Sequence, residues 1–159
     1  MDIKALKPAN DDSALTEYVT AMIDDQMFGL PISRVQDVFI PERLTRVPLA
    51  PREVAGILNL RGRIVTAIDM RARLSLPPRE AGHSQMAAGV DLRGESFGLL
   101  IDSIGEVVKL RNDAREPNPV NLDPRLALMA LGVYRLEGRL LVVLDVDAVL
   151  DVAKDAAAA

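Results

Sequence analysis

Apolar and polar residues alternate along much of this chain, and a period of two predicts β-strands rather than helices. The alternation runs through residues 18–23, stops at 24–26 and resumes over 28–33, as expected for a hairpin. Residues 140–146 are almost continuously apolar, which is typical of a strand covered on both faces. The pattern therefore predicts an all-β protein.

Three pairs of the type X-Gly separate neighbouring apolar runs: Arg61-Gly62, Arg93-Gly94 and Glu137-Gly138. Glycine adopts positive φ without steric cost, and the tight turns of hairpins require positive φ. Each pair therefore predicts a turn between two antiparallel strands.

Helix is expected only in short pieces. Proline suits the first helical position, so Pro51 predicts a turn running to Ala55, and Pro124 opens a second short element. Residues 147–154 form a candidate terminal helix. Proline and glycine mark breaks at residues 77–84, which include His83, and at residues 111–124.

An internal repeat gives the strongest signal. Residues 55–74 align without gaps to residues 131–150, and residues 28–38 align to 97–107. Each half of the chain therefore has the same order of five expected strands. Two small barrels or closed sheets would leave no exposed strand edge, so we expect one domain built from two similar subdomains.

Positions that the two copies share are those that both folds need. Gly62 matches Gly138, and both are assigned as structural turn glycines. Asp69 matches Asp145, which favours strand-end acids that cap or turn the backbone over a catalytic pair.

Positions that differ between the copies are free to carry a specific function. Arg61 takes the place of Glu137, and Asn59 takes the place of Arg135. The planar guanidinium suits bidentate pairing with carboxylates at interfaces, so Arg61 is a candidate binding residue. The alternative is a solvated arginine in a turn.

The segment 35–40 is a second candidate surface. In an extended strand, Val35, Asp37 and Phe39 point to one side and the alternate residues to the other. Val35 and Phe39 are therefore candidates for an apolar patch beside Asp37. The alternative is that both faces are covered by the other subdomain.

Composition excludes several classes of function. The 159 residues include no cysteine and one histidine, so there is no disulfide framework, thiol nucleophile or multi-histidine metal cluster. No phosphate-binding glycine motif, signal peptide or membrane-length apolar run is present. We therefore expect a cytoplasmic binding module with no catalytic residue, no metal site and no cofactor.

Charge is unevenly distributed along the chain. Residues 30–79 contain nine arginines against four acids, although the whole chain has a net charge of −4. This basic segment is a candidate docking face for an acidic partner, with solvated arginines at turns and strand edges as the alternative.

One segment resembles a known family. Residues 54–65, with the sequence VAGILNLRGRIV, and the following Ile68-Asp69-Met70-Arg71 resemble the signature of CheW, the bacterial chemotaxis coupling family. Residues 28–38 and 98–107 are similar to two further blocks of that family. The resemblance spans residues 16–152.

The resemblance implies two SH3-like five-stranded subdomains around a shared hydrophobic core. We assign residues 15–152 to the CheW-like domain, between flexible tails at 1–14 and 153–159. The subdomains are expected at about 15–78 and 84–152, with the chain ends free to cross between them.

The resemblance also implies a non-catalytic adaptor that couples chemoreceptor tips to the histidine kinase CheA. CheA carries a homologous regulatory domain, and the two related folds pair through opposite subdomains into rings. Such an adaptor is a monomer that joins receptor arrays at the membrane without inserting into it.

Val35, Asp37 and Arg61 match receptor-binding positions of the family. We expect a receptor helix to dock between the subdomains, with Val35 as an apolar anchor and Arg61 fixing the orientation. The family usually has glutamate at the position of Asp37, and pairing between Asp37 and Arg61 is a hypothesis.

Two other functions remain open. The nearest alternative is a CheW-like adaptor of a non-flagellar chemosensory pathway, or a piece of a kinase or of a longer fused protein. A small-barrel nucleic-acid-binding protein is the remaining alternative, which the acidic balance, five aromatic residues and lack of tryptophan disfavour.

Overall fold

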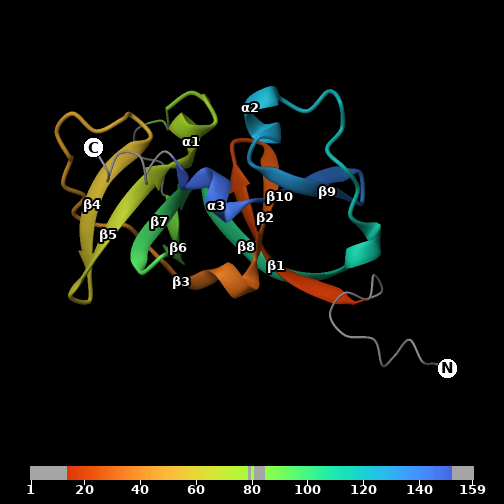
Figure 1. Cartoon of the computed structure of the whole chain (residues 1–159), viewed down its shortest axis with the longest axis horizontal. Coiled ribbons are helices and arrows are strands. Elements are labelled where there is room, and N and C mark those ends of the chain that lie inside the picture. The colour runs from red at the N-terminus through yellow and green to blue at the C-terminus, as the bar shows by residue number, and fades with distance from the viewer. Residues whose placement is uncertain (1–13, 79, 81–84, 152–159) are drawn as a thin grey trace.

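Two five-stranded sheets lie side by side in the computed structural model, which describes residues 14–78, 80 and 85–151 (Figure 1). The expected tails, apart from Ala14, and His83 lie outside the described residues.

Sheet 1 has the spatial strand order β8-β1-β2-β10-β9. Its strands are β1 (Leu15–Ile23), β2 (Gln26–Pro31), β8 (Ser103–Arg111), β9 (Ala130–Leu136) and β10 (Arg139–Leu144).

Sheet 2 has the order β3-β6-β7-β5-β4. Its strands are β3 (Val35–Phe39), β4 (Val54–Leu60), β5 (Arg63–Asp69), β6 (Met86–Leu92) and β7 (Glu95–Ile101).

The helices of the described residues are short, as predicted. They are η2 (Ile32–Arg34), α1 (Met70–Arg73), η3 (Asn112–Ala114), α2 (Pro124–Ala127) and α3 (Val146–Val149). The predicted all-β class with a few short helices is confirmed.

The two repeats exchange their first hairpins. The first repeat runs from β1 to β5 and the second from β6 to β10. The hairpin β1–β2 joins sheet 1 through parallel pairing of β2 with β10, and β6–β7 joins sheet 2 through parallel pairing of β7 with β5. Under this exchange the two sheets have the same strand order.

The sheets therefore differ from the expected subdomains at 15–78 and 84–152. Each sheet takes strands from both ranges, because each first hairpin pairs with the last hairpin of the other repeat. The N-terminal hairpin β1–β2 does cross to the strands of the second repeat, and the hairpin β6–β7 crosses in return to the strands of the first.

Short bridges curl each sheet towards a barrel. In sheet 2 the segment after β3 pairs with β4, where the Thr45 N–H donates to the carbonyl of Ile57 at 2.8 Å. In sheet 1 Glu116, after β8, pairs with Val133 of β9 in the same way.

Each sheet buries both of its faces, as β10 illustrates. Val142 and Leu144 enter a core shared by the two sheets, whereas Leu141 and Val143 enter a smaller core of sheet 1 that contains Tyr134. The continuous apolar run of this strand follows from that double burial, as predicted.

Aspartates at equivalent strand ends cap two of the short helices. Asp69 Oδ1 accepts a hydrogen bond from the N–H of Arg71 at 3.0 Å and begins α1, and Asp145 Oδ1 accepts from Ala148 at 3.3 Å and begins α3. The predicted capping role is confirmed, although α3 begins at Val146 rather than at residue 147.

The turn glycines are confirmed as well. Gly62 has φ +84° after Arg61 at 54°, and Gly138 has φ +82° after Glu137 at 44°. Consecutive positive φ values match the type I′ turn that joins twisted antiparallel strands.

We expect Gly62→Val to destabilise the fold by about 1–2 kcal/mol or more, because a β-branched side chain resists positive φ. A Cβ at residue 62 meets nothing within 4 Å, so the cost is one of backbone conformation alone. Gly62→Asn is the control and should lose less, since asparagine tolerates this conformation. Thermal unfolding measures both, and an unchanged Tm for the valine variant would contradict this account.

Candidate functional site

Arg61 and Asp37 lie together on sheet 2. Arg61 stands at the tip of the β4–β5 turn and Asp37 at the centre of β3, and Arg61 Nη1 is 3.5 Å from Asp37 Oδ2. The two strands are the outer members of the sheet, and its curling brings them close. The hypothesised pairing is thus present in the structure. The Arg61 side chain is 76% exposed and that of Asp37 is 23% exposed.

Asn59 fixes the turn that presents Arg61. Its Oδ1 accepts a hydrogen bond from the N–H of Gly62 at 2.8 Å. In the equivalent turn of sheet 1, Arg135 replaces Asn59 and pairs with Glu116 at 3.0 Å. The two turn tips therefore differ in charge, and only the first is held by a hydrogen bond to the side chain at the position of Asn59. The asymmetry of the repeat indicated such a difference.

Val35 lies at the rim of the shared core. It begins β3 opposite Val90 of β6 and is half-buried against that core. Two further apolar side chains are exposed, Ile32 in η2 and Val107 on β8, and the sequence pattern does not identify them as binding candidates. In the repeat, Val107 aligns with Val38, which is likewise exposed in the structure.

The prediction that Phe39 contributes to an exposed patch is wrong. Phe39 is buried in the small core of sheet 2, because the curl of the sheet covers that end of β3. The exposed apolar residues are on the opposite face, where Val38 is 40% and Ile40 is 64% exposed.

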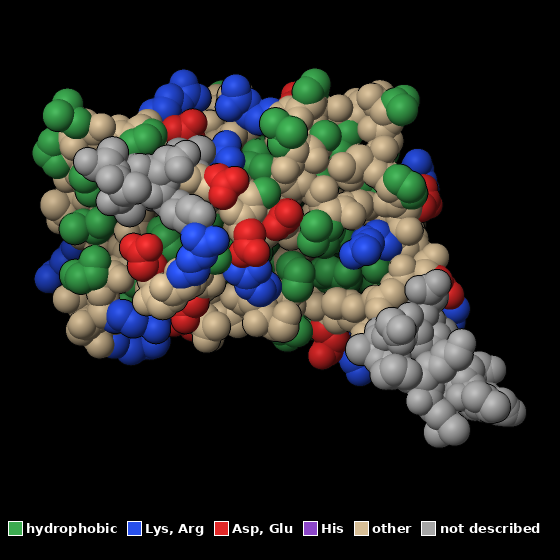
Figure 2. Space-filling view, viewed as in Figure 1, with side chains coloured by type: hydrophobic (Ala, Val, Ile, Leu, Met, Phe, Trp, Pro, Cys, Tyr) green, Lys and Arg blue, Asp and Glu red, His purple; other side chains and the backbone are tan. Residues whose placement is uncertain are grey.

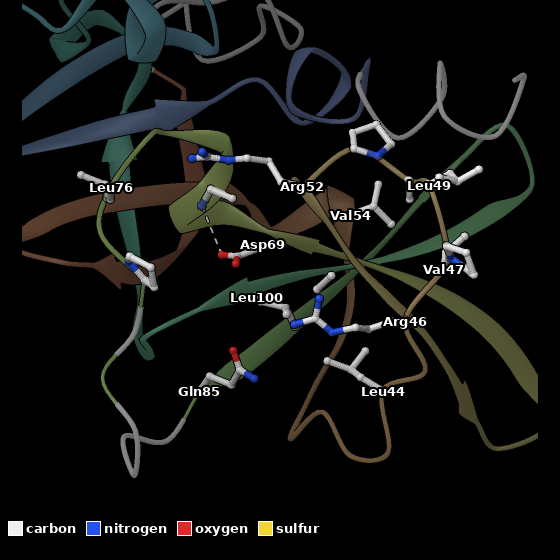
Figure 3. Close-up of a pocket in the computed structure, with 16 residues that line it drawn as sticks. Leu44, Arg46, Val47, Leu49, Arg52, Val54, Asp69, Leu76, Gln85 and Leu100 are labelled. Atoms are coloured by element: carbon white, nitrogen blue, oxygen red, sulfur yellow. Dashed lines mark hydrogen bonds between the residues drawn. The ribbon is translucent and has the colours of Figure 1, made fainter.

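A cavity of about 1000 Å³ lies between the β3–β4 connection and the end of α1. Figure 3 shows Arg46 and Arg52 among its lining residues, with Leu44, Val54 and Leu100 on the walls. Asp69 also lines the cavity, but its carboxylate is engaged in capping α1. The cavity thus has largely apolar walls, and apart from the capping Asp69 its charged side chains are arginines.

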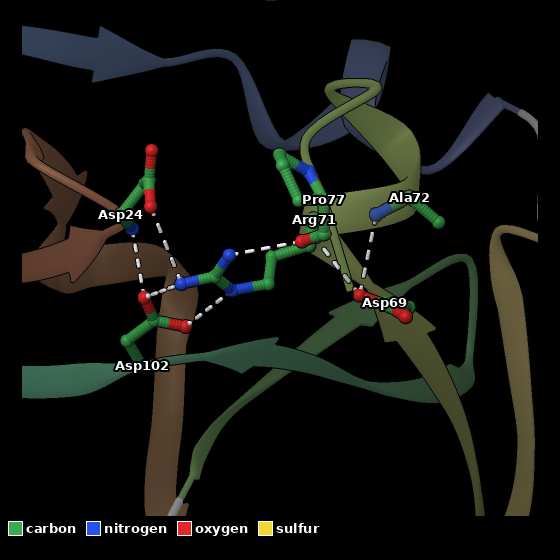
Figure 4. A network of polar contacts seen from close by, with 6 residues as sticks. All are labelled: Asp24, Asp69, Arg71, Ala72, Pro77 and Asp102. Carbon is green, nitrogen blue, oxygen red and sulfur yellow. Dashed lines mark hydrogen bonds and ion pairs between the residues drawn. The ribbon is translucent and has the colours of Figure 1, made fainter. Parts of the chain in front are cut away.

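Arg71 links the two sheets (Figure 4). Its Nε and Nη2 donate to the two carboxylate oxygens of Asp102 at 3.0 and 2.6 Å, and Nη1 donates to the carbonyl of Pro77 at 2.9 Å. Asp24, in the β1–β2 turn, lies 3.5 Å from Nη2 and donates its N–H to Asp102. The Arg71 side chain is only 14% exposed. Hydrogen bonding to Asp102 raises the pKa of Arg71 and outweighs burial, which lowers it.

A second ion pair joins the sheets, with the positions of the cation and the anion reversed. Arg34, on η2, donates to Asp147 of α3 at 2.8 Å. In the alignment of the repeats, Asp147 occupies the position of Arg71. The helix supplies the cation in one contact and the anion in the other.

No group of three or more histidine, cysteine or acidic residues that could hold a metal ion occurs in the described part of the chain. Among the same residues, no helix has the length and apolar character needed to cross a membrane.

Comparison with known proteins gives consistent matches. The family model described as the CheW-like domain matches residues 17–154. The chemotaxis protein CheW of Rhizobium meliloti (strain 1021) is 26% identical over 133 residues, which cover 84% of this chain and 86% of that protein. The chemotaxis protein CheW of Bacillus subtilis (strain 168) is 25% identical over 135 residues, or 85% of this chain and 86% of the relative.

A solved structure shares the fold. The crystal structure of the scaffolding protein TtCheW from Thermoanaerobacter tengcongensis superposes with a TM-score of 0.73 at 24% identity. The match covers 81% of this chain and 83% of that one.

We expect Arg71→Lys to lower the free energy of unfolding by about 1.5–3 kcal/mol, because lysine cannot reproduce a bidentate hydrogen bond to a largely buried carboxylate. Arg34→Lys is the matched control and should cost about 1 kcal/mol or less, since its contact with Asp147 is more exposed. Urea denaturation measures both variants. Equal losses would contradict the assignment of Arg71 as the stronger link.

Proposed function

This chain belongs to the family of CheW-like domains, and from that premise we propose that it couples chemoreceptors to a CheA-type histidine kinase in chemosensory signalling. In this role it is a non-catalytic adaptor that needs no cofactor. It acts in the cytoplasm and is recruited to receptor arrays at the membrane. The pairing of Arg61 with Asp37 beside the rim of the shared core is the observation that carries the proposal.

Arg61 is built to recognise a carboxylate on a partner. Asp37 is its one ion-pair partner within the described residues, at 3.5 Å, and the side chain remains largely exposed. Several guanidinium N–H groups are therefore free to donate to an incoming acid, and bidentate pairing also fixes its orientation.

Two apolar side chains on the edge strands of the sheets are candidates for the rest of the contact. Val35 is half-buried on the edge strand β3, and Val107 lies exposed on the edge strand β8 of the other sheet. Apolar residues exposed on a protein surface suit the apolar stripe of a helix. We infer that the tip of a receptor helical hairpin docks here, with Val35 and Val107 as anchors and Arg61 beside them.

The kinase would contact the two ends of the molecule. Figure 2 shows hydrophobic side chains near both ends, next to basic ones, and most of the acidic side chains of this face between them. Val47 and Leu49 are exposed in the β3–β4 connection, and Val120 and Leu128 are exposed in the equivalent β8–β9 connection. Exposed apolar groups of this kind mark interaction sites, and two of them let a monomer join a ring between related domains.

We expect Arg61→Glu, which copies the second repeat, to weaken binding of a purified chemoreceptor cytoplasmic fragment by about tenfold or more, or ~1.4 kcal/mol. The Tm should hardly change, because the side chain is exposed and its ion pair is long. Glu137→Arg at the equivalent turn is the matched control and should leave receptor affinity unchanged. Biosensor titration and thermal unfolding give the two readouts.

A pull-down with the same variants tests the whole proposal. The wild-type chain should recover a receptor and a CheA-type kinase, and Arg61→Glu should lose the receptor selectively. The cellular process that the recovered receptor and kinase control would distinguish a flagellar pathway from another chemosensory pathway. Recovery of neither partner, or unfolding of Arg61→Glu, would contradict the proposed role.

A further inference from the structure

Gly89 provides the space that the Asp37 carboxylate occupies. Gly89 lies on β6, directly opposite Asp37 of β3, and it is buried. A Cβ at residue 89 would overlap Asp37 Oδ1, and its three nearest neighbours would all be atoms of Asp37. No side chain fits at this position unless the carboxylate moves.

The two oxygens of Asp37 have different surroundings. Oδ1 is buried and has no hydrogen-bond partner in the described structure, whereas Oδ2 faces Arg61. Burying an unpaired carboxylate oxygen costs free energy. The surrounding sheet must therefore hold Asp37 in this retracted position, in which its carboxylate lies against the backbone of β6. The carboxylate fits there because Gly89 has no side chain.

The sister sheet shows what happens without the glycine. Thr20 of β1 is the equivalent of Gly89, since Thr20 pairs with Gly29 as Gly89 pairs with Gly98. Thr20 is buried and its Oγ1 donates to the carbonyl of Glu106 at 2.7 Å. Glu106 is the equivalent of Asp37 in the aligned repeat, and it is exposed.

We propose that Gly89 is a positioning residue for receptor recognition, which draws the Asp37 carboxylate into the sheet so that Arg61 keeps its guanidinium available to a partner. This inference rests on the proposed function of Arg61. Gly89 acts through Asp37 and contacts no partner itself.

The consequence for binding follows from where the carboxylate lies. A retracted Asp37 presents one oxygen to Arg61 and keeps the other away from the surface. An Asp37 that points outward, as Glu106 does, competes with the partner's acid for Arg61 and repels it. Displacing Asp37 should therefore weaken receptor capture without removing either charged residue.

The test is Gly89→Thr, which copies the sister sheet and supplies a hydroxyl for the same backbone contact that Thr20 makes. We expect its affinity for a purified chemoreceptor cytoplasmic fragment to fall about tenfold, or ~1.4 kcal/mol. In an Asp37→Ala background, which has no carboxylate to displace, Gly89→Thr should have no further effect. A structural perturbation of β6 alone would lower affinity in both backgrounds, so the double-mutant cycle separates the two explanations.

A crystal structure of Gly89→Thr provides a readout that needs no receptor. Asp37 should have left its position against residue 89, with its distance to Arg61 changed. Should this variant not fold, Gly89→Ala carries the smallest side chain that still displaces the carboxylate, and the same cycle applies to it.

The outcomes separate this inference from the proposed function. Receptor binding that is lost in Arg61→Glu but unchanged in Gly89→Thr overturns the role of Gly89 alone. A loss that persists in the Asp37→Ala background, or a crystal structure with Asp37 unmoved, also overturns it. A wild-type chain that does not bind the receptor fragment overturns both the proposed function and this inference.

Discussion

The parallel pairing of β2 with β10 and of β7 with β5 is the contact on which the rest of the molecule depends. It places the first hairpin of each repeat in the centre of the sheet that the other repeat completes. Neither repeat can then bury its apolar faces alone, and the two sheets share one core. The same pairing leaves β3 and β8 as edge strands, so the surface with the candidate receptor contacts follows from the exchange.

A nearly symmetric scaffold gains a single recognition site by changing a few positions. The two sheets share strand order, turn glycines and capping aspartates, which the fold needs twice. Arg61 and Glu137 differ at the turn tips, and Gly89 and Thr20 differ at the equivalent point of the neighbouring strands. Asp37 comes from the first repeat and Gly89 from the second, so the hairpin exchange brings together the two parts of one arrangement.

Local features of the structure could be predicted from the sequence because they depend on neighbouring residues. A glycine after Arg61 or Glu137 permits consecutive positive φ values, and an aspartate after an apolar strand caps the following turn. The assignment of hairpins to sheets could not be predicted, since both repeats have the same local pattern and pair equally well by period alone. The burial of Phe39 depends on the curl of the whole sheet, and Gly89 gives no signal until its neighbour on β3 is known.

The two ion pairs between the sheets, Arg71–Asp102 and Arg34–Asp147, help to determine which repeat each first hairpin pairs with. If each repeat closed on itself, α1 would meet the crossover segment of its own repeat, and Arg71 would face Ser33, the aligned counterpart of Asp102. Asp147 would likewise face Ser103, the aligned counterpart of Arg34, so both ion pairs would be lost. The two ion pairs therefore favour reciprocal exchange over self-closed halves. Exchange of the β1–β2 hairpin between two copies of the chain would keep both ion pairs. The ion pairs therefore specify which repeats pair with each other, but not whether the paired repeats belong to the same molecule.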